Sequence, residues 1–196
     1  AVARTANQSQ TIFIICSDHG CELEDADKRG GNEVFGWRTH PEHIEVPLIC
    51  SPTEKSPHTG GVHDSMTFSA TVLDLLGVVP DPSFKGKSAF SAGRPVVISE
   101  NAGRGNADLQ RSNIYFTMTS TTHKAMARLK GTTLTVHRLY DCRSDPDELH
   151  NIVTQPMVTN AVGHLIDGLF RERGSLLSNR GVRRGEIQIT DMTNEL

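Results

Sequence analysis

Asp18 and His19 are adjacent residues that directly follow a run of apolar and β-branched side chains at positions 11–16. Such a run predicts a strand buried on both faces, as in a parallel sheet covered by helices. In open α/β sheets, ligands bind at the carboxyl ends of the strands. A carboxylate offers an oxygen donor and an imidazole a nitrogen donor, and a tight turn at Gly20 would let both reach one cation. The alternative is a hydrogen-bonded turn without a ligand.

The elements expected around this pair begin with a second short apolar strand at 46–50, which Pro47 places at a strand entry or an edge. We interpret the two strands as a buried parallel pair. Residues 66–77 predict an amphipathic helix that stops at Gly77. Two strands alone do not make a stable sheet covered on both faces, so we expect further strands of this sheet outside the chain.

The later part of the chain predicts a small antiparallel sheet followed by a helix. Its expected strands are 95–99, 114–118, 125–129 and 134–140. The helix is expected at 156–173, where apolar residues recur at helical spacing. From Gly174 onward the sequence is polar, basic at Arg183 and Arg184, and without a clear period.

The overall composition excludes several classes of protein. The 196 residues carry 20 Lys and Arg against 23 Asp and Glu, a formal net charge of -3, which argues against a nucleic-acid-binding protein. No apolar run approaches the roughly 20 residues that a membrane-spanning helix needs. The four cysteines are scattered without a C-x-x-C pair, so neither a zinc ribbon nor a disulfide framework is supported. We interpret Cys16 as a core residue.

Several short blocks together resemble the carboxyl-terminal part of the sulfatase family, which belongs to the alkaline phosphatase superfamily. They occur in the family's order over about residues 11–153. The blocks are Ile12-Phe-Ile-Ile-Cys-Ser-Asp-His-Gly20, Val46-Pro-Leu-Ile49, Thr71-Val-Leu-Asp-Leu-Leu-Gly77, and Leu139-Tyr-Asp141 with Asp145-Pro-Asp-Glu148 and Asn151-Ile152.

The resemblance implies an α/β fold: part of an alkaline-phosphatase-like, mostly parallel sheet covered by helices, followed by a small antiparallel sheet with a terminal helix. The corresponding organisation has four parts. These are a polar amino-terminal extension at 1–10, the carboxyl-terminal part of the α/β core at 11–94, the small sheet and helix at 95–175, and a polar tail at 176–196.

The resemblance also implies hydrolysis of sulfate esters with a divalent cation. We expect calcium first, with magnesium, manganese and zinc as alternatives. Asp18 and His19 occupy positions at which the family binds this metal. Many sulfatases have Asn at the second position, and His there is similar to phosphonate monoester hydrolases and phosphatases of the superfamily.

The family has a basic residue that contacts the sulfate, ahead of the Val-Pro strand. The corresponding position here is closer to Gly36. Arg38 is a candidate to bind the anion through its two-pronged guanidinium. His40 is a candidate general acid or metal ligand. The alternative is that Arg38, His40 and His43 are solvated loop residues.

The family's nucleophile is a formylglycine made from Cys or Ser in a Cys/Ser-x-Pro-x-Arg motif. Cys50-Ser-Pro-Thr-Glu54 imitates this motif, but Glu54 stands where Arg would bind the anion, and a carboxylate repels a sulfate. The segment also follows the Asp-His block, whereas the family's nucleophile precedes it. We interpret it as a Pro/Ser loop and expect the nucleophile outside this chain.

Three hypotheses follow. The first is the carboxyl-terminal part of a metal-dependent sulfatase acting on a sulfate-ester small molecule or a sulfated sugar, inactive without the missing amino-terminal part. The second is a phosphate or phosphonate ester hydrolase, or phosphoryl transferase, of the same superfamily. The third is a non-catalytic binding remnant of the fold. The family resemblance alone suggests a periplasmic, secreted or lysosomal location.

Overall fold

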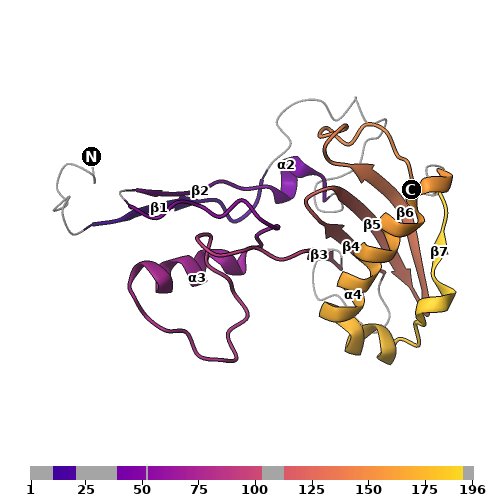
Figure 1. Cartoon of the computed structure of the whole chain (residues 1–196). Helices are drawn as coiled ribbons and strands as arrows, with labels where there is room; N and C mark the ends of the chain where they lie inside the picture. Colours follow the sequence, from indigo (N-terminus) through magenta and orange to yellow (C-terminus); the bar gives the residue numbers. More distant parts are fainter. Residues whose placement is uncertain (1–10, 21–38, 52, 103–112, 192–196) are drawn as a thin grey trace.

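The computed structural model describes residues 11–20, 39–51, 53–102 and 113–191. In Figure 1 a narrow strand pair and a short helix lie apart from a larger sheet that a long helix crosses. The elements, in chain order, are β1 (Phe13–Cys16), α2 (Pro41–Ile44), β2 (Leu48–Ser51), α3 (Met66–Leu75), β3 (Val97–Asn101), β4 (Ile114–Thr119), β5 (His123–Lys130), β6 (Thr133–Asp141), the 3-10 helix η1 (Pro156–Val158), α4 (Thr159–Asn179), the 3-10 helix η2 (Arg184–Glu186) and β7 (Gln188–Ile189).

β1 and β2 form a two-stranded sheet and run antiparallel. The expected parallel direction is therefore wrong, because apolar content predicts burial and carries no information on strand direction. Ile15 and Ile49 are paired across the two strands and are 59% and 53% exposed. Cys16 is also exposed, so its interpretation as a core residue is wrong. Within this structure the pair is not covered on both faces.

α3 confirms the predicted helix, with Leu76 as its C-cap. Gly77 follows at φ +66, a left-handed conformation that glycine adopts without steric cost, and it ends the helix. Asp64 Oδ1 accepts a hydrogen bond from the Met66 amide at 3.0 Å, which satisfies one free amide of the first turn. The buried face carries Thr67, Ala70 and Thr71, whereas the apolar side chains of Phe68 and Leu76 are exposed.

The second sheet contains five strands in the order β3-β4-β5-β6-β7. The first four strands are antiparallel neighbours, which confirms the predicted sheet. β5 and β6 form a hairpin in which Lys130 pairs with Thr133, with a turn at Gly131 and Thr132. One face carries the hydrophobic core, formed by fully buried residues that alternate along the strands: Ile114, Phe116, Met118, Ala125, Ala127, Leu129, Leu134 and Val136.

α4 packs its apolar side against this face and so confirms the predicted terminal helix. Figure 1 shows the helix lying across the sheet. Val162, Leu165 and Leu169 are buried in the core. None of the helices in the described ranges combines the length and hydropathy that crossing a bilayer requires.

Residues 176–191 of the expected polar tail are part of the folded structure. α4 continues to Asn179, beyond a non-helical Arg173. Leu177 and Val182 are buried, and β7 pairs in parallel with β6. Isolated apolar residues separated by polar ones give no helical or strand period, which is why the sequence pattern missed this segment.

Candidate functional site

The turn after β1 presents Asp18 and His19 on the surface of the described structure. Asp18 Oδ1 accepts a hydrogen bond from the His19 backbone amide at 3.0 Å. Ser17 Oγ donates to the His19 carbonyl oxygen at 2.6 Å, which fixes the backbone of the turn. A carboxylate has about four lone-pair positions, so this hydrogen bond leaves Asp18 able to bind a cation.

The His19 ring is oriented by a backbone carbonyl. Its Nδ1 lies 2.8 Å from the Gly20 carbonyl oxygen. Because a carbonyl oxygen only accepts, Nδ1 carries the proton, and the neutral ring has its lone pair on Nε2. Metal-binding histidines are typically held in this way, with the other ring nitrogen donating to a carbonyl or carboxylate. The turn is thus hydrogen-bonded and also has donors that suit a divalent cation.

Gly20 anchors this turn against α2. The Gly20 amide donates to the His43 carbonyl oxygen at 2.9 Å. A Cβ atom at position 20 would lie 1.9 Å from the backbone oxygen of Glu42, so only glycine permits this approach. The tight turn expected at Gly20 is therefore present, and it is held by the backbone of α2.

The two donors do not by themselves make a complete metal centre. Within the described ranges, no three His, Cys, Asp or Glu side chains are grouped to hold an ion. Zinc takes four ligands and calcium six to eight. A centre at this turn would need further donors from outside the described residues, and metal binding by Asp18 and His19 stays a prediction.

His40 lies in a buried position and only 2% of its surface is exposed. Its Nδ1 lies 2.6 Å from Oε2 of Glu148, and its Nε2 lies 3.5 Å from Nη1 of Arg138. The idea of a solvated His40 is therefore wrong. Its role as general acid or metal ligand stays a prediction, and these contacts favour a structural role. Arg38 lies outside the described residues.

Glu148 and Lys124 form a buried ion pair that the sequence pattern did not reveal. Glu148 Oε1 lies 2.5 Å from Lys124 Nζ, and the two side chains are 2% and 1% exposed. The ammonium makes no well-aligned hydrogen bond among the described residues, so the contact is chiefly electrostatic. Two signals were available in the sequence: a Lys within an apolar strand, and a Glu that closes the Asp145-Pro-Asp-Glu148 block.

Two of the described cysteines, Cys50 and Cys142, have thiols whose pKa is raised. Burial and the nearby Glu148 carboxylate raise the pKa of the Cys142 thiol to about 11, which keeps it protonated near neutral pH. Burial also raises the pKa of Cys50. Cys50 lies in β2, within the strand expected at 46–50.

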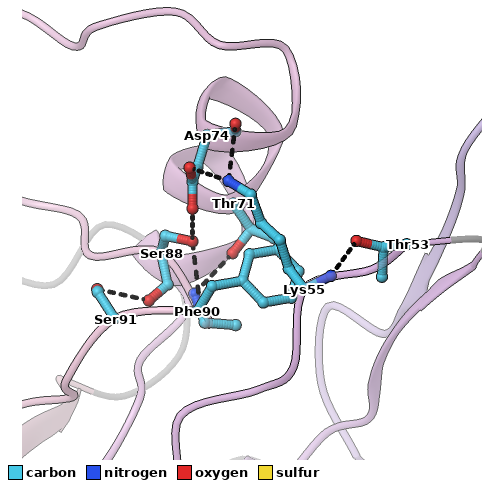
Figure 2. Close-up of polar contacts among 8 residues, drawn as sticks. Thr53, Lys55, Thr71, Asp74, Ser88, Phe90 and Ser91 are labelled. Carbon is cyan, nitrogen blue, oxygen red and sulfur yellow. Dashed lines mark hydrogen bonds and ion pairs between the residues drawn. The ribbon is translucent and has the colours of Figure 1, made fainter.

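Lys55, in the segment after β2, forms polar contacts with Asp74 of α3. Figure 2 shows that Lys55 and Ser88 both contact the Asp74 carboxylate. Lys55 Nζ lies 2.5 Å from Asp74 Oδ1, and Ser88 Oγ donates to Asp74 Oδ2 at 2.6 Å. Hydrogen bonds from Lys55 and then Ser88 lower the pKa of Asp74. Thr71 Oγ1 accepts from the Ala89 amide at 3.0 Å. The polar side chains of Lys55, Thr71, Asp74 and Ser88 hydrogen-bond to one another or to nearby backbone, so we interpret these contacts as structural.

The chain matches no protein-family model and no curated protein sequence. Its fold is similar to that of a putative sulfatase from Bacteroides thetaiotaomicron, with 18% identity and a TM-score of 0.60 over 88% of this chain. It is also similar to a 2-O GAG sulfatase, with 16% identity and a TM-score of 0.59 over 88% of this chain. A phosphonate monoester hydrolase of Agrobacterium radiobacter follows, with 19% identity and a TM-score of 0.54 over 86% of this chain.

These similarities confirm the expected fold and its extent. The chain spans 38% of the length of each of the two sulfatase structures and 35% of the phosphonate monoester hydrolase. The described structure is α/β, with the small antiparallel sheet and terminal helix that the resemblance implied. Its fold is therefore similar to one portion of the fold of these two sulfatases and of the phosphonate monoester hydrolase.

Proposed function

We propose that this chain is the carboxyl-terminal part of a metal-dependent hydrolase of sulfate esters, and that Asp18 and His19 contribute to its metal centre. One observation carries the proposal. In a chain with this fold, Nδ1 of the His19 ring donates a hydrogen bond to the Gly20 carbonyl oxygen. The lone pair of the ring is therefore on Nε2, the nitrogen remote from the backbone.

In this proposal the residues of the chain bind and orient. The Asp18 carboxylate supplies an anionic oxygen donor and His19 Nε2 a neutral nitrogen donor. When bound, a divalent cation supplies electrostatic stabilisation of the negative charge that develops on the ester oxygens. The family resemblance implies a formylglycine nucleophile, which we place in the missing amino-terminal part. We expect calcium first, with magnesium, manganese and zinc as alternatives.

Exposed apolar side chains support the view that the chain is completed by another segment. Ile15 and Ile49 on the β1–β2 pair are more than half exposed, and Leu76 of the α3 end is 70% exposed. Large exposed apolar groups that cluster on neighbouring elements mark surfaces that are normally covered. The missing strands of the sheet are our candidate for this cover.

A phosphate or phosphonate ester hydrolase is the second candidate. Its support is the similarity to a phosphonate monoester hydrolase, together with His in place of the Asn that many sulfatases have at position 19. The two candidates share one architecture and differ in the ester that the missing part and its loops accept. A non-catalytic binding remnant of the fold is the third candidate and predicts a chain without metal affinity.

The test compares variants in the longer protein that contains this chain. We expect Asp18→Asn and His19→Ala each to weaken metal binding by at least about tenfold, since even indirect partners of a metal ligand affect affinity that much. Calorimetric titration with calcium, magnesium, manganese and zinc measures this. Glu54→Gln and His164→Gln are matched controls, because both residues are exposed and are distant from the turn in sequence.

Turnover of paired aryl sulfate, aryl phosphate and phosphonate monoester substrates separates the first two candidates. Sulfate ester hydrolysis that a chelator abolishes supports the sulfatase proposal. Preference for the phosphorus esters supports the second candidate. Absence of metal binding in the longer protein would contradict both and leave the binding remnant.

A further inference from the structure

We propose that Lys124, Glu148 and His40 are positioning residues for the Asp18–His19 turn, through a continuous chain of contacts that crosses from the five-stranded sheet to α2. The inference rests on the proposed function for the role of the turn. The contacts themselves are independent of any metal.

The chain of contacts begins on β5 with Lys124, whose side chain is 1% exposed. Its ammonium compensates the buried Glu148 carboxylate at 2.5 Å. A buried ion pair fixes the positions of both partners, because moving either one leaves an uncompensated charge in a poorly solvated interior. Glu148 also has φ +54, a conformation that is uncommon outside glycine. Its backbone amide donates to the Asp145 carbonyl oxygen at 3.1 Å, which helps to hold this conformation.

The second link joins Glu148 to His40 across 108 residues of sequence. The contact between His40 Nδ1 and Glu148 Oε2 is 2.6 Å long. Arg138 of β6 has only donors, so its approach to Nε2 requires a lone pair there. In this arrangement the His40 ring donates to Glu148 through Nδ1 and accepts from Arg138 through Nε2. Both nitrogens of the ring are engaged, and its orientation is fixed by the sheet.

The third link runs through the backbone of α2. The His40 carbonyl oxygen accepts hydrogen bonds from the amides of His43 at 3.0 Å and Ile44 at 3.3 Å. The His43 carbonyl oxygen in turn accepts from the Gly20 amide at 2.9 Å. The Gly20 carbonyl oxygen orients the His19 ring at 2.8 Å. A displacement of His40 would therefore change the orientation of the His19 ring, because hydrogen bonds of α2 and of the turn connect the two residues.

A second contact fixes the same segment to the same face of the sheet. Thr39 Oγ1 and Thr117 Oγ1 form a buried hydrogen bond between the residue before His40 and β4. Loss of the Glu148 contact therefore loosens the segment at one of two attachment points. This is why we expect a change in the position of the turn and not detachment of α2.

The experiment uses nuclear magnetic resonance on the full 196-residue chain. His40→Phe keeps a ring of similar size and removes both polar contacts, whereas His40→Asn retains an N–H donor near the position of Nδ1. We expect hydrogen exchange of the Gly20 amide to rise at least about tenfold in His40→Phe and in Lys124→Met, after correction for global stability measured at β5 amides. In His40→Asn, the Gly20 amide should recover most of its protection.

Gly168→Ala is the matched control for general destabilisation. It disturbs the opposite face of the sheet, where a Cβ atom at position 168 would lie 2.7 Å from Val96. It should lower stability without selective loss of protection at Gly20.

Manganese broadening of the His19 and Gly20 resonances is the second readout and detects weak binding. We expect the broadening at a given manganese concentration to fall in His40→Phe and to recover in His40→Asn.

The two readouts separate the two proposals. Gly20 protection that is the same in wild type, His40→Phe and Lys124→Met overturns the positioning role. Failure of His40→Asn to restore that protection also overturns it. If manganese broadens no resonance at the turn in wild type or in the longer protein, the metal proposal fails, while the exchange data still decide whether the sheet positions the turn.

Discussion

At the scale of single residues, His137 of β6 is a buried histidine whose charge state is set by its surroundings. It is 6% exposed, and its Nδ1 has no hydrogen-bond partner among the described residues. Burial, together with the positive charge of Arg138, lowers the pKa of His137 to about 4. The folded protein therefore keeps this ring neutral at pH values at which the unfolded chain protonates it.

We expect the free energy of unfolding to fall as the pH decreases from about 6.5 to about 4. In this window the unfolded state takes up a proton that the folded state excludes. One proton corresponds to about 1.4 kcal/mol per pH unit, so the total loss is roughly 3 kcal/mol. Above this window both states are neutral at His137 and its contribution to stability is complete. Urea unfolding at a series of pH values measures this dependence.

His137→Phe should reduce the slope of stability against pH in this window, because it removes the titrating group and keeps an aromatic ring. His164→Gln, on the exposed side of α4, controls for the loss of one imidazole. An unchanged slope in His137→Phe would show that other groups cause the acid sensitivity.

At the scale of elements, two of the three glycines of α4, Gly163 and Gly168, have opposite surroundings. A Cβ atom at Gly168 would lie 2.7 Å from Cβ and Cγ1 of Val96, whereas a Cβ atom at Gly163 would have no neighbour within 4 Å. Val96 is itself buried, at 3% exposure, and lies just before β3. The helix therefore approaches the sheet closely at one glycine only.

We predict that Gly168→Ala destabilises the protein by about 1–3 kcal/mol, because the extra methyl group overpacks the helix–sheet contact. Gly163→Ala should stabilise it by about 0.5–1 kcal/mol, the gain in helix propensity at an exposed position. Thermal and urea unfolding of both variants measure the difference. Two changes of the same sign would mean that backbone propensity, and not packing against Val96, decides both positions.

At the scale of the whole molecule, the described residues form two sheets that differ in how far packing against other elements stabilises them. The five-stranded sheet is packed against α4 and holds the hydrophobic core. The β1–β2 pair has only two strands and exposes Ile15 and Ile49. Two-stranded sheets are marginally stable in water without a packed face.

We therefore predict that hydrogen exchange in the isolated chain is fast for the β1 amides and slow for the β5 amides. The β1 amides should exchange through local opening, at a free energy well below that of global unfolding. In the longer protein that we propose, the β1 amides should become protected to about the same level as β5. Equal protection of β1 and β5 in the isolated chain would show that this strand pair needs no additional cover.

Much of the fold could be predicted from local patterns. The strands of the second sheet, the α3 helix with its stop at Gly77, and most of α4 each carry a periodic apolar signal or a turn residue. The turn at residues 18–20 was also predictable, because polar residues and glycine follow an apolar run. Each of these signals lies within a few neighbouring residues, where steric and hydrogen-bonding preferences act directly.

The tertiary structure decided the direction of β2, the exposure of Cys16 and the burial of His40. It alone brought Lys124 and Glu148 to His40, residues that are distant in sequence and have no local period in common. A polar side chain can be buried only where partners from other elements compensate it. No local pattern contains that information, so the amino-acid sequence by itself located the turn with its two candidate donors, and only the folded chain determined what holds that turn in place.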